Sequence, residues 1–160
     1  MATIPSPRFV LIYDGVCRLC DGVVRFVLTR DKGGAQFRFC SLQSRVAEPL
    51  LAEAGITQAD ALQSFVLLDS QGPRRVLRRS DAALAIASAL PQPWATLGFL
   101  GFCVPRFLRD AIYEFVAARR YSIFGKADDG ECLAPTRNVL SRFLDADEIR
   151  ESQSSKKRKD

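Results

Sequence analysis

Two cysteines stand close together near the start of the chain, in the segment IYDGVCRLCDGVV that begins at Ile12. Cys17 and Cys20 are separated by two residues, and Asp14 lies three residues before the first of them. A pair with this spacing can carry thiol–disulfide exchange if one thiol ionises easily, or it can supply half of a tetrahedral zinc site. Two inert thiols are the third interpretation.

The local sequence favours redox chemistry. The apolar run FVLIY (9–13) indicates a buried strand, and helical periodicity begins soon after Cys17. Free backbone amides and the helix dipole at a helix start stabilise a thiolate, and Arg18 adds a neighbouring positive charge. We therefore predict Cys17 as the nucleophile and the more exposed thiol, with Cys20 more enclosed and able to resolve a mixed disulfide.

Asp14 has two interpretations. Its carboxylate could cap the turn formed by Asp14 and Gly15, as aspartate often does in such sequences. It could instead relay a proton to or from Cys20 during resolution. Because a carboxylate next to Cys17 would by itself disfavour a thiolate, the residue type alone does not decide between the two.

Composition excludes several kinds of site. The chain of 160 residues contains no histidine, which rules out imidazole catalysis and imidazole metal ligands. Of its five cysteines, Cys40, Cys103 and Cys132 stand alone in the sequence, so neither a metal nor a cofactor is predicted. The net charge is +5, of which residues 151–160 hold +2, and we predict no nucleic-acid partner. The start of the chain does not resemble a secretory signal, so a reducing, cytoplasmic location is expected.

The order of predicted elements defines a fold. After the first strand and helix, strands are expected at 37–40, 64–69 and 74–79, and helices at 44–55 and 80–90. The order β-α-β-α-β-β-α places the first two strands parallel through a right-handed crossover and the last two antiparallel across a tight turn. This is an α/β, thioredoxin-like mixed four-stranded sheet, expected over residues 9–90 after a short tail at 1–8.

The remainder is predicted to be a helical extension packed on that domain. It covers residues 91–150, and a disordered basic tail follows at 151–160. The apolar segment 94–104 is too short to span a bilayer and is broken by Pro105, and we interpret it as a buried helix or a docking segment. Contact with a membrane surface is the less favoured alternative. Residues 106–121 indicate an amphipathic helix whose apolar face includes Phe107, Ile112 and Phe115.

Cys40 follows the second predicted strand. Parallel strands end at the same edge of a sheet, so Cys40 should emerge beside the loop that carries Cys17, within ~12 Å by strand spacing. It is then either a thiol that only packs or an auxiliary thiol able to exchange with the pair.

Three segments together resemble the DCC family of predicted thiol–disulfide oxidoreductases. They are YDGVCRLCDGVVRFVLTRD, which begins at Tyr13, SLQS (41–44), and RDAIYEFVAARRYSIFG, which begins at Arg109 and is followed by Cys132. The family is named for the Asp, Cys and Cys that stand here as Asp14, Cys17 and Cys20. The resemblance covers most of the chain, and it implies a thioredoxin-like N-terminal part and a redox activity.

Two hypotheses about function follow. In the first, the chain is an oxidoreductase that uses Cys17 and Cys20 to exchange disulfides with a protein or a small thiol. In the second, it is a non-catalytic thioredoxin-like binding module that docks a partner or a membrane surface, with its cysteines inert or holding a metal. Neither the substrate nor the oligomeric state is predicted.

Overall fold

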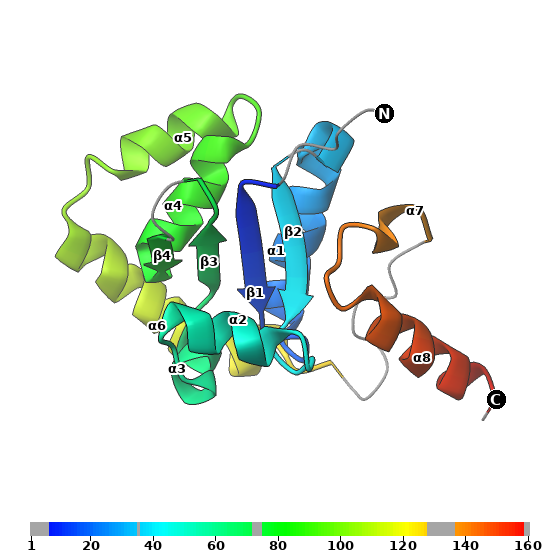
Figure 1. Ribbon diagram of the computed structural model, residues 1–160. Helices are drawn as coiled ribbons and strands as arrows, with labels where there is room; N and C mark the ends of the chain where they lie inside the picture. The colour runs from blue at the N-terminus through cyan, green and yellow to red at the C-terminus, as the bar shows by residue number, and fades with distance from the viewer. Residues whose placement is uncertain (1–6, 35, 72–74, 128–136, 159–160) are drawn as a thin grey trace.

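The computed structural model describes residues 7–34, 36–71, 75–127 and 137–158. The strands are β1 (Phe9–Tyr13), β2 (Phe37–Ser41), β3 (Val66–Asp69) and β4 (Arg75–Arg78). The helices are α1 (Arg18–Arg30), α2 (Ala47–Ala54), α3 (Gln58–Gln63), α4 (Arg79–Ala89), α5 (Trp94–Gly101), α6 (Arg106–Phe124), α7 (Arg137–Leu140) and α8 (Ala146–Lys157), with a 3-10 turn, η1 (Lys32–Gly34), after α1. Figure 1 shows their arrangement.

The four strands form one mixed sheet in the order β2-β1-β3-β4. β1 and β2 are parallel, because α1 carries the chain back between them, and Ile12 is in register with Cys40. β3 is antiparallel to both β1 and β4. The predicted strand directions are confirmed, and the sheet with its flanking helices is a thioredoxin-like α/β fold.

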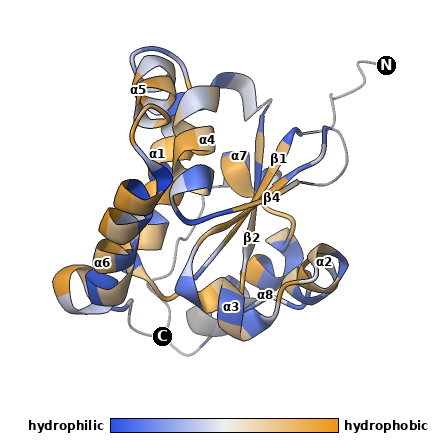
Figure 2. Cartoon of the chain, turned by 90° about the vertical axis from the view of Figure 1, so that its left-hand side faces the viewer, coloured by the Kyte–Doolittle hydropathy of each residue, from blue (hydrophilic) through white to orange (hydrophobic). Residues whose placement is uncertain are grey.

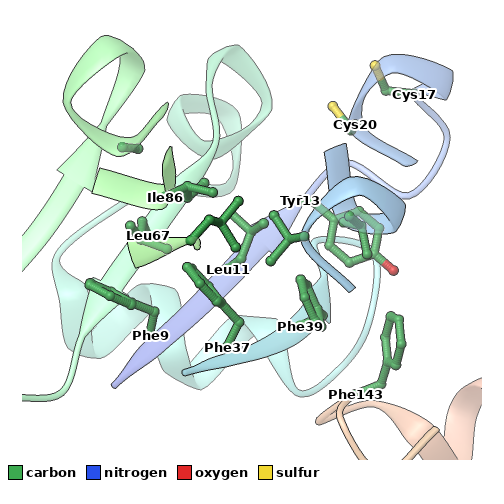
Figure 3. Close-up of a cluster of buried hydrophobic side chains, with 14 residues drawn as sticks. Phe9, Leu11, Tyr13, Cys17, Cys20, Phe37, Phe39, Leu67, Ile86 and Phe143 are labelled. Carbon is green, nitrogen blue, oxygen red and sulfur yellow. The ribbon is translucent and has the colours of Figure 1, made fainter. Parts of the chain in front are cut away.

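Helices cover both faces of the sheet, so alternate side chains of each central strand enter different cores. On one face, side chains of β1 and β2 such as Leu11, Phe37 and Phe39 pack with α1 and α4 (Figure 3). On the other face, Ile12, Cys40 and Val66 pack against α2 and α3. The continuous apolar run of β1 is therefore the expected pattern of a strand buried on two sides.

Several element boundaries differ from prediction. The glycine pair Gly33 and Gly34 is the place where the sequence predicts the end of this helix. α1 instead ends at Arg30, because the Asp31 carboxylate leaves the helix to accept bonds from the backbone of the next strand. Ser80 begins the helix predicted at 80–90, where serine often acts as the N-cap. It lies instead inside α4, and its hydroxyl donates to Asp110 of α6. The short helix α3 was not predicted. Gly55 ends α2 in the left-handed conformation, as expected.

The C-terminal part of the chain packs on two sides of this core. α5 and α6 lie against α4, and α6 also contacts α1 (Figure 1). The segment before α8 runs along the free edge of β2, where the Phe39 amide donates to the Arg142 carbonyl at 2.9 Å. The predicted division at residues 90 and 91 remains a prediction.

Two predictions about the terminal segments need comment. The tail expected to be disordered from residue 151 continues α8 as far as Lys157, with residues 151–155 exposed. Glu, Ser, Gln and Lys tolerate an exposed helical turn, so absence of apolar contacts did not end the helix. Most of the tail predicted at 1–8 lies outside the described residues. Among the helices of the described part of the chain, none is long and apolar enough to cross a membrane.

Candidate functional site

The cysteine pair occupies the first turn of α1, at one end of the larger core (Figure 3). Cys17 is the N-cap residue of this helix, and its carbonyl accepts the first helical bond, from the Asp21 amide at 3.0 Å. The Cys17 amide in turn donates to the Asp14 carbonyl at 3.2 Å, which closes the turn between β1 and α1. The predicted position of Cys17 at a helix start is confirmed.

The two thiols have opposite acidities. The pKa of Cys17 is lowered from 9.0 to about 6, chiefly because its sulfur accepts hydrogen bonds from the thiol and amide of Cys20, with a further contribution from the positive charge of Arg120. Burial opposes this shift but does not outweigh it. The pKa of Cys20 is raised far above its usual range, because its proton bonds to Cys17 and its sulfur is buried. At neutral pH the pair is therefore one thiolate and one thiol.

Asp14 is the centre of a buried polar network next to the pair. Oδ1 accepts hydrogen bonds from the Val16 amide at 3.2 Å and from Gln43 Nε2 at 2.8 Å. Oδ2 accepts from the Tyr121 hydroxyl and lies 3.5 Å from Nη2 of Arg120. The side chain thus caps the turn, as one interpretation proposed, and it also anchors residues from two distant segments of the chain.

Arg120 brings a buried positive charge to this network from α6. Its Nη2 donates to the Leu62 carbonyl and to the Tyr121 hydroxyl, the latter at 3.0 Å. The charge lowers the pKa values of both cysteines. Arg18, expected to supply a positive charge, is exposed, and its amide lies 3.5 Å from the Gly125 carbonyl.

Three residues of this network were missed from the sequence: Gln43, Arg120 and Tyr121. All three fall within SLQS and RRYSIFG, two of the segments that carry the family resemblance. The available signal was the recurrence of polar residues within specific motifs far from the cysteines. Single-sequence periodicity did not show that these motifs meet at Asp14.

The segment after α6 pairs with the backbone at Cys17. Gly125–Lys126–Ala127, here called the strap, runs antiparallel to residues 16–18, with Lys126 opposite Cys17. The Ala127 amide donates to the Val16 carbonyl at 2.9 Å. The exposed fraction of Cys17 is 0% and that of Cys20 is 3%. The prediction that Cys17 is the more exposed thiol is wrong, since both thiols are buried, and the backbone of Cys17 is paired with a segment more than a hundred residues away in sequence.

Cys40 lies on the other face of the sheet from the pair. It is at the predicted edge, opposite Ile12 of β1, but its side chain belongs to the core under α2. Its sulfur is 3.3 Å from the Ser44 hydroxyl, and burial raises its pKa to about 12. This environment supports the interpretation that Cys40 packs as a thiol, and an auxiliary role in exchange remains a prediction.

The other cysteines are not brought to the pair within the described residues. Cys103 is exposed between α5 and α6, and Cys132 lies outside the described residues. In the part of the chain that the structure describes, no group of three or more cysteine and carboxylate side chains could hold a metal ion. The described site is therefore a dithiol with an acid–arginine–tyrosine network.

Comparison with known proteins identifies the class to which this site belongs. Residues 11–126 match the family model of the DCC1-like thiol–disulfide oxidoreductases, and the chain belongs to this family. The match spans the cysteine pair, Gln43, Arg120, Tyr121 and the first part of the strap.

Two relatives show similarity over most of the chain. The uncharacterized protein YuxK of Bacillus subtilis is 40% identical over 144 residues, which cover 90% of this chain and 99% of that protein. The DCC family protein At1g52590, chloroplastic, of Arabidopsis thaliana is 37% identical over 124 residues, or 78% of this chain and 69% of that protein. No solved structure matches the chain.

Proposed function

We propose that the chain catalyses thiol–disulfide exchange with Cys17 as the nucleophile and Cys20 as the resolving thiol. The observation that carries this proposal is the opposite acidity of two adjacent thiols at a helix start. With a pKa of about 6, Cys17 is mostly thiolate at neutral pH, and the thiolate is the form that attacks disulfides. Membership of a family of thiol–disulfide oxidoreductases supports the same chemistry.

The reaction consists of two exchanges. The Cys17 thiolate attacks one sulfur of a substrate disulfide, the substrate S–S bond breaks, and one half leaves as a thiolate that takes up a proton. Cys20 then loses its proton and attacks Cys17, which forms the Cys17–Cys20 disulfide and releases the second half as a thiol. Two electrons pass from the pair to the substrate, and a cellular thiol reductant restores the dithiol.

The first exchange itself prepares Cys20 for the second. The largest cause of its raised pKa is the hydrogen bond to the Cys17 sulfur, and the negative charge of that sulfur adds to it. Once Cys17 is part of a neutral mixed disulfide, both effects are lost and only burial and the charge of Asp14 keep the pKa high. The pKa of Cys20 therefore falls when its thiolate is needed.

Asp14 and Arg120 act on this step through their charges and their positions. The carboxylate of Asp14 raises the pKa of Cys20, and the guanidinium of Arg120 lowers it. Since Arg120 is held by Asp14 and Tyr121, we assign to Asp14 the role of fixing the cation next to the sulfurs. Its oxygens accept bonds from Val16, Gln43 and Tyr121, so this role accounts for its contacts more fully than a proton relay does.

Cys17 has no exposed surface, so the site must open before substrate reaches its sulfur. We infer that it opens at the strap, which is paired with the backbone at Cys17. The backbone of residues 16–18 that the strap occupies could then pair with an extended segment of a protein substrate. A disulfide in a peptide or protein, or a small-thiol disulfide, is the proposed substrate class.

Single-cysteine variants test the proposal. Cys17→Ser should abolish the reduction of insulin and of a glutathione mixed disulfide, and Cys20→Ser should accumulate a stable mixed disulfide that mass spectrometry detects. Cys40→Ser is the matched control, since this thiol lies on the other face of the sheet, and it should retain turnover. Full activity in both Cys17→Ser and Cys20→Ser would refute the proposal that this pair catalyses the exchange. An ordinary pKa of Cys17 together with absence of turnover would favour the binding module.

A further inference from the structure

Helix α6 turns its polar side toward the protein and its apolar side toward solvent. Its residues that are not exposed recur at intervals of three and four, and five of the six are polar: Arg109, Asp110, Tyr113, Ala117, Arg120 and Tyr121. In contrast, Phe107 is 77% exposed, Ile112 is 59%, Phe115 is 57% and Ile123 is 60%. The apolar face predicted from the sequence exists, but its side chains are exposed and do not pack on the core. Figure 2 shows α6 at the outside of the fold, with apolar and polar residues along it.

Helix α5 and the turn after it extend the apolar surface. Residues 94–105 contain no charged side chain, yet Phe99 is 65% exposed and Leu100 is 58% exposed. α5 rests on α4 through small residues, since a Cβ atom added to Gly98 would lie 2.6 Å from the Ser88 backbone nitrogen. The large side chains of α5 are consequently left outside this contact. The interpretation of this segment as a buried helix is wrong.

An exposed apolar face of this extent marks a contact surface in folded proteins. Its charges indicate what covers it. Residues 94–126 hold five basic and two acidic side chains, but two of the basic ones, Arg109 and Arg120, are largely buried and paired with acids. The ion-pair partners outside this segment are Arg79 and Asp81 of α4 and Asp14, and with these three side chains included the net charge is +2.

A second copy of the chain would bring two surfaces of the same positive charge together, whereas an anionic lipid surface complements them. We propose that the α5–α6 face, meaning the exposed apolar side chains of residues 97–124, docks on the surface of an anionic lipid bilayer. Phenylalanine, leucine and isoleucine side chains enter the boundary between headgroups and acyl chains, and the exposed Arg106 and Arg119 contact the headgroups. Arg119 stacks on Phe115, with its guanidinium 3.9 Å from the ring centroid. Such a side chain can keep its charged end among the headgroups while its apolar stem and the ring lie deeper.

Docking would also hold the dithiol near the membrane. The inward face of the same helix carries Arg120 and Tyr121, which contact Asp14 beside the cysteine pair. The inference does not depend on the proposed disulfide exchange, because the docking face contains neither cysteine of the pair.

Vesicle sedimentation with the full reduced chain tests the docking. Binding should be strong to vesicles of phosphatidylcholine with phosphatidylglycerol, weak to phosphatidylcholine alone, and reduced by added salt. The triple variant Phe107→Glu, Ile112→Glu, Phe115→Glu should lose at least roughly tenfold in partitioning to the anionic vesicles. Leu144→Glu, at a residue 41% exposed next to α7, is the matched control and should bind as the unmodified chain does.

Both variants should fold, because all the substituted side chains are exposed. Melting curves followed by circular dichroism check this. Absence of binding to either vesicle, binding without dependence on anionic lipid, or unchanged binding by the triple variant would each overturn the proposal. A concentration-dependent dimer that the triple variant abolishes, without vesicle binding, would show instead that a second copy covers the face. Turnover on a disulfide substrate is measured separately, so failure of docking and failure of the redox proposal are distinguishable.

Discussion

Replacing Arg120 with methionine removes the one described arginine that is buried beside the cysteine pair. Its side chain is 9% exposed and that of Asp14 is 2% exposed, and their charged groups are 3.5 Å apart. Methionine retains much of the packing volume of the arginine stem but neither its charge nor its hydrogen bonds. The change should therefore affect the acidity of Cys17 and the stability of the fold together.

The expected shift in acidity is moderate. An opposite charge nearby typically moves a pKa by about one to three units, and the charge of Arg120 contributes less to Cys17 than the hydrogen bonds from Cys20 do. We expect the pKa of Cys17 to rise from about 6 to ~7. Because Asp14 loses its buried partner but keeps three hydrogen-bond donors, unfolding should become easier by about 3 kcal/mol, near the lower end of the range for broken buried pairs.

The pKa should be measured directly, by the ultraviolet absorbance of the thiolate as a function of pH. A reaction rate is a poorer measure. At pH ~6 the variant would have about one fifth of the thiolate, but a thiolate of higher pKa is intrinsically about threefold more reactive, so the rate would fall only about twofold. Arg119→Met is the control, since Arg119 is the exposed neighbour on the same helix and should leave the pKa of Cys17 unchanged.

An unchanged Cys17 pKa in folded Arg120→Met would refute the electrostatic reasoning. If this variant does not fold, Arg120→Lys is the alternative. It keeps the positive charge with fewer hydrogen-bond donors, so the pKa of Cys17 should stay close to about 6. Tyr121→Phe removes the donor to Asp14 and the hydroxyl that accepts from Arg120, but it keeps the positive charge and should change the pKa of Cys17 less than Arg120→Met does.

Four further outcomes are expected. Because the pKa of Cys17 is about 6 in the fold and 9.0 in the unfolded chain, its ionisation stabilises the reduced fold fully above pH 9.0, and this contribution is lost as the pH falls through about 6. The free energy of unfolding from denaturant titrations should therefore decline from pH 9.0 to about 6, and it should decline less in Cys17→Ser. Gly125→Val should loosen the strap, because Gly125 has a φ of 81°, and alkylation of Cys17 should then be faster than in the unmodified chain. Arg142→Met should cost about 3–5 kcal/mol in calorimetry or denaturant titration, since it leaves the buried Asp31 carboxylate without its ion pair. Deleting residues 152–160 should leave the melting temperature nearly unchanged, and a large decrease would mean that the end of α8 is packed or paired.

The architecture around the cysteines could be predicted because it depends on local patterns. The run 9–13, the turn at Asp14 and the helical spacing after Cys17 together fix a strand, a turn and a helix, and hence a cysteine at a helix N-terminus. The parallel pairing of β1 and β2 follows from the handedness of the crossover between them. Membership of the family was likewise readable in short motifs.

Tertiary contacts decided the features that determine how the site works. Neighbouring residues of a strand point to opposite faces of the sheet, so Cys40 and Phe39 enter different cores. Because helices cover both faces, the sequence did not indicate whether the cysteine pair lies on the face of Cys40 or on that of Phe39. The periodicity of residues 106–121 defined an apolar and a polar side, and hydrophobic burial predicts that the apolar side faces the core. The reverse occurs because Asp14 is buried and requires a cation and donors, which Arg120 and Tyr121 supply from the polar side. The need of buried Asp14 for a cation, and the pairing of the strap with residues 16–18, both depend on contacts between segments more than a hundred residues apart in sequence. Local sequence patterns do not encode such contacts.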